Sequence, residues 1–266
     1  MPLIRPFAGL RPAPARAQDV AAPPYDVLST DEARKLALGK PWSFLHISKP
    51  EIDLPPQTNP YSAEVYATGQ RSFARMQAEG ILRRDSAPYY YFYSLTMGAH
   101  TQTGLVAAAS VADYVNNRIR KHEFTRPDKE DDRVRQIDAL NAQTGPVFLT
   151  YRRQAAVDAI AAQVTADAPE VDIELDTAAI GGARVRHRLW PVRDIAVNAR
   201  LSELFDAIDY LYIADGHHRS AAAARVAGMR RGTHAHPRGD EAYNYFLAVI
   251  FPDTQMQILD YNRVVR

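Results

Sequence analysis

The sequence contains no cysteine among its 266 residues. This absence excludes disulfide bonds, a thiolate nucleophile and metal sites built on cysteine. A chain without cysteine is compatible with any redox compartment, so this feature alone does not assign a location.

A large excess of charge of one sign is also missing. The formal net charge is only +1, so no basic field attracts the protein to nucleic acid or to a membrane surface. No apolar run approaches the roughly 18 residues needed to span a bilayer, and residues 1–10 lack the apolar segment of a secretory signal. We therefore expect a cytoplasmic protein with no membrane partner and no nucleic acid partner.

The common nucleotide-binding and metal-binding motifs are absent as well. The sequence has neither G-x-x-x-x-G-K-[ST] nor G-x-G-x-x-G, which argues against a P-loop or a Rossmann site. It has no H-E-x-x-H spacing. Adjacent His217 and His218 point in different directions and rarely hold one ion together. We therefore expect no metal site made of protein ligands alone.

Hydrophobic residues make up 46% of the chain, which is enough for a sizeable core. Hairpin signals and helical segments alternate irregularly, so we predict one α+β unit over residues 1–266, with mixed sheets, β-hairpins and peripheral helices. Strands are expected at 3–10, 43–48, 88–97, 101–111, 147–151, 170–175, 185–192, 210–214, 243–251 and 257–265, and helices at 29–39, 61–79, 128–142, 155–166, 202–209 and from about 220.

Two helix starts carry a recognisable cap. Ser29 and Glu32 have the spacing of a capping box, and the helix that they open is expected to end near Gly39. Thr125 and Asp128 repeat this spacing before the helix at 128–142. Residues 116–127, which lead into this second helix, are expected to form a polar loop.

The most informative segment joins a short apolar run, 210–214, to a run of strong helix formers from about Ser220. A helix that starts after a glycine leaves backbone N–H groups free, and the positive end of the helix dipole adds to their attraction for anions. Imidazole and guanidinium groups strengthen such a site for phosphate or pyrophosphate. We predict that the junction binds phosphate through Asp215, Gly216, His217, His218 and Arg219. The alternative is a polar helix start whose histidines satisfy local carbonyl groups.

A second cluster of charges lies in residues 118–129. The candidate substrate-binding residues here are Lys121, His122, Arg126 and Lys129. Glu123, or His122 itself, is available for proton transfer. The alternative is a solvated charged turn, which is the usual role of a charge run.

A third candidate is the stiff loop that contains Pro23 and Pro24, because prolines fix the backbone on both sides. Tyr25 is a candidate for substrate binding and Asp26 for catalysis, although both also fit a structural turn. His46 is interpreted as a satisfied core residue on a strand. The helix-to-strand turn at 143–146 could also contact a ligand.

Four stretches together resemble one bacterial and archaeal family, catalogued as domain of unknown function 1015. They are Arg5-Pro6-Phe7, Ala22-Pro23-Pro24-Tyr25-Asp26-Val27, the run from Lys121-His122-Glu123 to Asp132, and Ala214-Asp215-Gly216-His217-His218-Arg219. The resemblance runs from end to end. Family members are generally longer, and their pattern continues beyond Asp260-Tyr261-Asn262-Arg263. The resemblance therefore implies a version shortened at the C-terminus.

The Gly-His-His-Arg element is also similar to the phosphate-binding turn of the ParB/sulfiredoxin superfamily, which includes partition proteins, sulfiredoxins and kinases of free serine. This resemblance implies a ParB/sulfiredoxin-like core around the strand–turn–helix unit, with nucleotide phosphates held at the helix start. It transfers only to Gly216, His217, His218 and Arg219, with Asp215 before them. In the serine kinases an acidic residue takes the hydroxyl proton, but no motif identifies it here.

Two functions follow as hypotheses. The first is phosphoryl transfer from ATP, ADP or pyrophosphate to the hydroxyl of a small metabolite, with free L-serine favoured. His217, His218 and Arg219 would then neutralise developing charge. Asp26 or Glu123 would accept the proton, on chemical grounds alone, and Mg²⁺ would bridge phosphate oxygens. The second is a nucleotide-binding regulatory protein, similar to the partition branch, that does not act on a small metabolite. Sulfinic acid repair is disfavoured because that chemistry uses cysteine.

Overall fold

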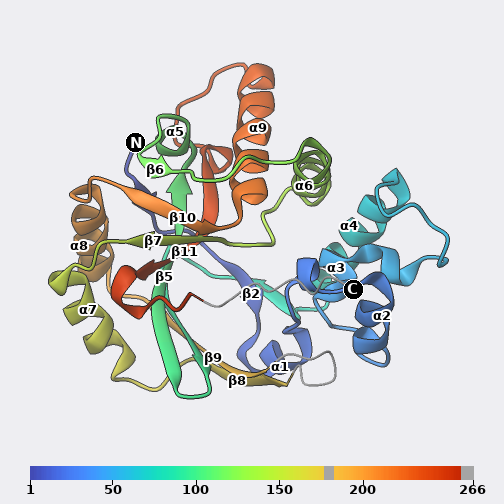
Figure 1. The fold of residues 1–266 in the computed structure, drawn as a ribbon, viewed down its shortest axis with the longest axis horizontal. Helices are drawn as coiled ribbons and strands as arrows, with labels where there is room; N and C mark the ends of the chain where they lie inside the picture. The colour runs from blue at the N-terminus through green and yellow to red at the C-terminus, as the bar shows by residue number, and fades with distance from the viewer. Residues whose placement is uncertain (177–182, 259–266) are drawn as a thin grey trace, which may run out of the picture.

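A computed structural model describes residues 1–176 and 183–258 (Figure 1). Within these residues the main sheet has nine strands in the order β6-β10-β7-β11-β5-β4-β9-β8, with β1 paired to β5 beside this path, and β2 pairs with β3 separately. The strands are β1 Ile4–Arg5, β2 Leu10–Pro12, β3 Leu82–Arg84, β4 Tyr90–Met97, β5 His100–Ser110, β6 Ile119–Arg120, β7 Val147–Tyr151, β8 Val171–Asp176, β9 Arg184–Val192, β10 Leu211–Asp215 and β11 Tyr245–Pro252.

The sheet is mixed. Strand β6 is parallel to β10 and β7 is parallel to β11, whereas β10 and β7 are antiparallel, as are β11 and β5. The α-helices are α1 Ala17–Val20, α2 Thr30–Ala37, α3 Leu45–Ser48, α4 Ala63–Ala78, α5 Val111–Val115, α6 Pro127–Leu140, α7 Ala155–Thr165, α8 Ile195–Asp206 and α9 His217–Thr233. The prediction of an α+β fold with a mixed sheet and surrounding helices is confirmed.

The helices form groups around the sheet. In Figure 1, α7 and α8 lie to the left of the sheet, α5, α6 and α9 lie above it, and α2, α3 and α4 form a separate helical part on the right. The main core joins the sheet to its helices through buried residues such as Phe92, Phe205, Ala223, Phe246 and Ile250. Strand β11 is buried along nearly all of its length, as expected of a strand covered on both faces.

The hairpin over residues 90–110 is confirmed. Strands β4 and β5 pair in antiparallel register from Tyr91 opposite Val106 to Met97 opposite His100. Gly98 takes a positive φ of 57° in the tight turn between them, a conformation that glycine adopts without steric cost. The capping box of Ser29 and Glu32 is also present at the start of α2.

Several local predictions are wrong. The segment 43–48 is not a strand, because residues Leu45–Ser48 form one helical turn, and this also places His46 on a helix. The side chains of Leu45 and Ile47 pack into two small N-terminal clusters, so packing decided the structure of a short apolar run that periodicity leaves ambiguous. Residues 116–127 are not all loop, since they include β6.

Two helix starts also differ from the prediction. Helix α8 begins at Ile195, earlier than the expected 202, because the side chain of Asp194 accepts hydrogen bonds from the first amides of this helix. The predicted capping box of Thr125 and Asp128 is wrong. Helix α6 starts at Pro127, and the hydroxyl of Thr125 donates a hydrogen bond to Glu130. The strand expected at 257–265 has no counterpart at 257–258, and its remainder lies outside the described residues.

Two parallel strand–helix units lie side by side. Strand β10 leads into α9, and its parallel neighbour β6 leads into α6 through residues 121–126. The contacts between the two helices proceed in the same order along both, from Arg126 with His218 to Asn141 with Arg230. The N-terminal ends of α6 and α9 therefore meet beyond the carboxyl ends of two parallel strands.

Among the residues that the structure describes, no helix combines the length and the apolar character required to cross a bilayer.

Candidate functional site

The turn between β10 and α9 depends on Gly216. This residue has φ 98° and ψ 30°, a conformation that L-residues rarely adopt. A Cβ atom here would lie 3.3 Å from the Cα of Val147 and 3.2 Å from the Nε of Arg219. Glycine therefore allows both the turn and the close approach of the Arg219 guanidinium to the backbone.

The start of α9 offers unpaired backbone donors. Its first intrahelical bond runs from the amide of Ser220 to the carbonyl of Gly216 (3.0 Å). The amides of His217, His218 and Arg219 therefore have no acceptor within the helix. The N-terminal end of α6 meets this point, and the positive ends of two helix dipoles reinforce each other there. The strand–glycine–helix geometry of the sequence prediction is present, and a second helix N-terminus adds to the positive potential at this point.

Both histidines accept a backbone N–H from the loop that precedes α6. The Nε2 of His218 accepts from the amide of Arg126 at 3.0 Å, and the Nε2 of His217 accepts from the amide of His122 at 3.4 Å. Each Nε2 must be unprotonated to accept, which leaves the ring proton on Nδ1. The histidine pair therefore attaches residues 122–126 to the start of α9.

The environments of the two rings differ. His217 is only 4% exposed, and burial, assisted by nearby His122, lowers the pKa of His217 below its usual 6.5. Its Nδ1 lies 3.4 Å from a carboxylate oxygen of Glu123. His218 is half-buried, and its ring lines a cavity of about 620 Å³. Of the two, only His218 faces this cavity.

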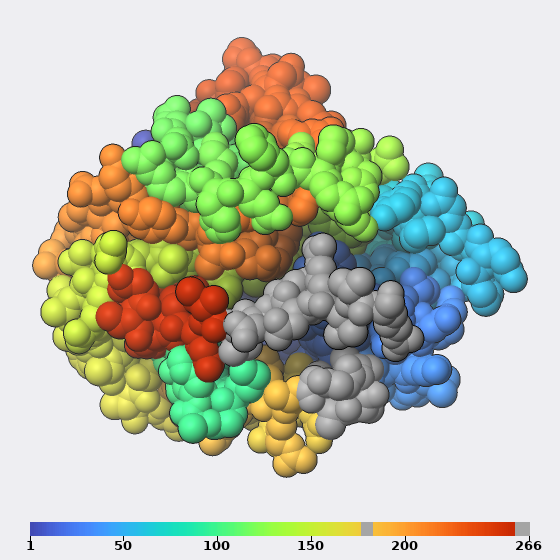
Figure 2. Space-filling model, viewed as in Figure 1, coloured from blue at the N-terminus to red at the C-terminus, as the bar shows by residue number. Residues whose placement is uncertain are grey.

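This cavity also brings together candidates that are far apart in the sequence. Tyr25 and Asp26 from the proline-rich loop line it with Arg126 and Lys129 from the start of α6. Figure 2 shows the green surface around α6 adjoining the cyan surface of α4, with the blue N-terminal helices next to α4. The proline-rich loop, the basic loop and the glycine turn thus meet at one site.

Other lining residues were missed by the sequence analysis. They come from α6, from the end of α3 with the short helical turn Pro50–Asp53 after it, and from α4 with the residues before it. They include Ser48, Lys49, Glu51, Tyr61, Tyr66, Asp132, Arg133 and Gln136. Lys49 and Glu51 form an ion pair at 3.1 Å. The hydroxyl of Tyr66 donates to Asp132 at 2.8 Å. Apart from Asp132, which ends one of the four family stretches, no motif links these positions, and many of their neighbours in the sequence are also polar, so no local signal marks them.

Tyr25 packs against a buried cation. The guanidinium of Arg133 lies 4.2 Å from the centre of its ring. Burial raises the pKa of the Tyr25 hydroxyl. Burial opposes the charge of Arg133, but Tyr25 and Asp132 outweigh it, and the pKa of Arg133 is raised. Arg133 therefore stays cationic at one wall of the cavity.

Arg219 lies beside this cavity. Its guanidinium donates to Asp215 at 2.5 Å and to the carbonyl of Pro146. It lines a small void of about 30 Å³ together with Tyr25, Arg133 and Gly145. The turn at 143–146 thus contacts the site through Arg219.

Seven sequence candidates do not line the 620 Å³ cavity, namely Asp215, Gly216, His217 and Arg219 of the glycine turn and Lys121, His122 and Glu123 of the basic loop. The ammonium of Lys121 donates to the carbonyl of Tyr114 and lies 4.3 Å from the centre of its ring. His122 and Glu123 face His217 instead. Residues 118–129 therefore divide, with Lys121 against Tyr114, 122–123 against His217, and Arg126 and Lys129 along the cavity.

The sequence comparisons agree with the resemblance noted above. Residues 4–266 match the family described as "Protein of unknown function (DUF1015)". The chain belongs to this family. All four stretches that carried the resemblance lie within the match. Comparisons with curated proteins and with solved structures returned no match.

The charges of the DUF1015 site are mixed. Asp26, Glu51 and Asp132 share the cavity with several cationic side chains. Within residues 1–176 and 183–258, no three histidine or acidic side chains come together in a way that could hold a metal ion. A Mg²⁺ ion bound in this cavity would therefore take most of its ligands from phosphate oxygens and water.

Proposed function

We propose that this DUF1015 protein transfers a phosphoryl group from ATP, ADP or pyrophosphate to the hydroxyl of a small metabolite, with free L-serine as the favoured acceptor. The observation that carries the proposal is the meeting of the α6 and α9 N-termini at a cavity lined by His218. Phosphoryl transfer depends mainly on positioning and on neutralising charge, and this arrangement supplies both.

The donor phosphates fit the start of α9. Of the first residues of α9, only His218 lines the cavity, and the side chains of Arg126 and Lys129 line it beside the start of α6. The amides of residues 217–219 have no acceptor within the helix and would donate to the phosphates. The similarity of the Gly-His-His-Arg turn to the phosphate-binding turn of the ParB/sulfiredoxin superfamily supports the same placement. A ParB/sulfiredoxin-like core is part of this proposal.

The acceptor fits the remainder of the cavity. An amino acid carries an ammonium and a carboxylate, and the walls supply Glu51 and Asp132 for the first and Lys49 and Arg133 for the second. A volume of about 620 Å³ lies within the range of about 300–1,000 Å³ typical of ligand sites. This mixture of charges favours a zwitterion over a neutral sugar.

In the proposed step the acceptor hydroxyl oxygen bonds to the terminal phosphorus while the bridging P–O bond breaks. The hydroxyl proton passes to a carboxylate, and ADP, AMP or inorganic phosphate leaves. Asp26 lines the cavity, whereas Glu123 lies against His217, so Asp26 is the better placed proton acceptor. Bound Mg²⁺ would neutralise charge on the phosphate oxygens.

The test is a search for the product. The protein is incubated with Mg²⁺, with ATP, ADP or pyrophosphate, and with a pool of amino acids and sugars, and phosphorylated products are identified by mass spectrometry. We expect phosphoserine from one of these donors. Lys129→Ala should lower turnover roughly tenfold or more, because it removes a charge-assisted contact. Arg152→Ala, whose side chain is 84% exposed outside the cavity, is the matched control.

Other outcomes decide against the enzyme. Nucleotide binding without any product would favour the regulatory protein. Full activity in both Lys129→Ala and Arg126→Ala would contradict the assignment of phosphate to this end of the cavity.

A further inference from the structure

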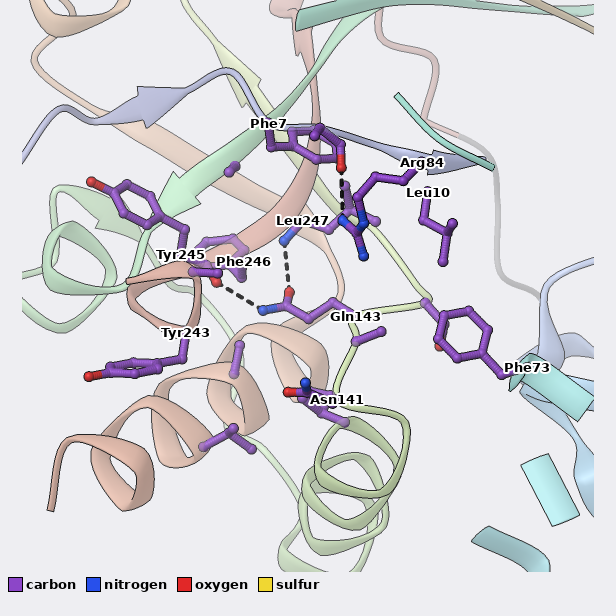
Figure 3. Close-up of a pocket in the computed structure, with 18 of the residues that line it drawn as sticks. Phe7, Leu10, Phe73, Arg84, Asn141, Gln143, Tyr243, Tyr245, Phe246 and Leu247 are labelled. Atoms are coloured by element: carbon purple, nitrogen blue, oxygen red, sulfur yellow. Dashed lines mark hydrogen bonds between the residues drawn. The ribbon is translucent and has the colours of Figure 1, made fainter. Parts of the chain in front are cut away.

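We propose that a second cavity, of about 510 Å³, binds a small organic anion with a flat apolar body. It lies between the N-terminal strands, the C-terminal end of α6, the outer half of α9 and the start of β11 (Figure 3). Gln143 and Thr144 line both this cavity and the small void beside Arg219, so the segment 143–145 separates it from the candidate site. The inference does not depend on the proposed function.

The charged side chains that line the second cavity are all cationic. They are Arg5, Arg84 and Arg230, and none of the described residues that line the cavity is acidic. The candidate site differs in this respect, since its walls carry carboxylates as well. Arg230 lies near the C-terminal end of α6, where it bonds to Asn141 and approaches Asp138 at 3.4 Å, so its charge is partly balanced. Arg5 and Arg84 therefore carry the argument.

These two arginines pair with neutral groups. Arg5 donates from Nη1 to the backbone carbonyl of Asp240 at 2.7 Å, and its guanidinium lies 3.8 Å from the centre of the Tyr245 ring. Its Nε is buried and has no hydrogen-bond partner among the described residues. Arg84 donates from Nη1 to the carbonyl of Ala8 at 3.1 Å. Neither guanidinium is paired with a carboxylate in the part of the chain that the structure describes, and an anionic ligand would supply the missing counter-charge.

Aromatic rings form much of the remaining wall. Phe7, Phe44, Phe73 and Tyr243 line the cavity and are each only half-buried, and Tyr245 is buried beside them. Figure 3 shows Phe7 and Tyr245 on the side of the strands and Phe73 across the cavity from them. Partly exposed aromatic side chains in a cavity wall favour a ligand with a flat apolar body.

The polar floor of the cavity is fixed in place. The side-chain amide of Gln143 donates to the carbonyl of Tyr245 at 2.9 Å and accepts from the amide of Leu247 at 2.7 Å (Figure 3). Because both ends of this amide are engaged, it does not compete for the arginines. An inorganic anion would leave most of a 510 Å³ space unfilled, so the geometry points to an anion with an organic body.

The experiment compares two fluorescent probes of the same shape. Anilinonaphthalene sulfonate carries an anionic group on a flat aromatic body, and phenylnaphthylamine has the same body without charge. Both are titrated into the wild-type protein. We expect saturable binding of the sulfonate at one site and at least about tenfold weaker binding of the neutral probe, the usual effect of losing a charge-assisted bond.

Variants locate the bound probe. Arg84→Gln removes an exposed side chain whose loss should leave the fold intact, and Arg230→Gln tests the opposite wall. Arg84→Gln should weaken sulfonate binding several-fold to about tenfold, and Arg230→Gln should weaken it less because its charge is already partly balanced. Arg83→Gln, next to Arg84 but outside the cavity, and Lys129→Gln, in the candidate site, should bind it as the wild type does.

The proposal fails if the neutral probe binds as tightly as the sulfonate, or if the wild-type protein shows no saturable binding. It also fails if both Arg84→Gln and Arg230→Gln bind normally, or if Lys129→Gln alone is impaired, since the probe would then occupy the other cavity. Because the readout is probe fluorescence, a failure of the kinase assay does not affect it.

Discussion

Replacing Gly216 with alanine is the sharpest structural perturbation of the strand–helix turn. The added Cβ would lie 3.3 Å from the Cα of Val147, and this contact is with backbone that cannot move aside. The residue would also keep a φ of 98°, which costs an L-residue about 1–2 kcal/mol. Crowding of a packed site costs about 1–3 kcal/mol more. We expect Gly216→Ala to lower the free energy of unfolding by about 2–5 kcal/mol.

Two other glycines separate the contributions to this loss. Gly98 has a φ of 57° and nothing within 4 Å of its Cβ position, so Gly98→Ala should cost only the conformational part, about 1–2 kcal/mol. Gly228 lies exposed in α9 with nothing within 4 Å of its Cβ position, so Gly228→Ala should stabilise the protein by about 0.5–1 kcal/mol.

Urea denaturation of the three variants and the wild type gives the comparison. The expected order of stability is Gly228→Ala, wild type, Gly98→Ala and then Gly216→Ala. If Gly216→Ala were as stable as Gly98→Ala, the close approach at Val147 and Arg219 would not constrain the turn, and the account of the site geometry would be wrong.

Three further predictions concern single side chains. Asp26→Asn should lower the rate of phosphoryl transfer at least about hundredfold without changing the melting temperature, since the side chain is exposed. If Asp26→Asn turned over as fast as the wild type and Glu123→Gln lost activity instead, Glu123 would be the proton acceptor. The pKa of His217 is lowered in the folded protein, so the folded state loses stability relative to the unfolded state as the pH falls below about 6.5. Urea denaturation at pH 7 and pH 5 should therefore show a smaller loss of unfolding free energy in His217→Asn than in the wild type. Equal losses would contradict the burial of His217 as a neutral ring. Tyr66→Phe removes the 2.8 Å bond to Asp132 and should lower the free energy of unfolding by about 1 kcal/mol; an unchanged value would show that this bond contributes nothing to stability.

Local features of the chain were predictable because neighbouring residues determine them. The aromatic and small-apolar runs on either side of Gly98 are typical of a hairpin, and the structure contains it. The glycine between an apolar run and a helix-forming run indicated the strand–turn–helix unit at Gly216, and this unit is present. In each case the required signal lies within about a dozen consecutive residues.

Features that depend on packing between distant segments were not predictable. Nothing in residues 118–129 indicates that β6 pairs in parallel with β10, yet this pairing brings the start of α6 to the start of α9. The far wall of the candidate site comes from Lys49, Glu51 and Tyr66, whose sequence neighbours carry no motif. The helical turn at Leu45–Ser48 was missed for the same reason, since its short apolar run fits a strand or a helix until its neighbours are known.

The most direct test of the central claim is a crystal structure of the protein soaked with pyrophosphate and Mg²⁺. We predict pyrophosphate density at the shared N-terminal end of α6 and α9, with oxygens within hydrogen-bond distance of the amides of residues 217–219 and of the His218 ring. Density bound elsewhere, or an α9 start that stays free of pyrophosphate at saturating concentration, would contradict the account.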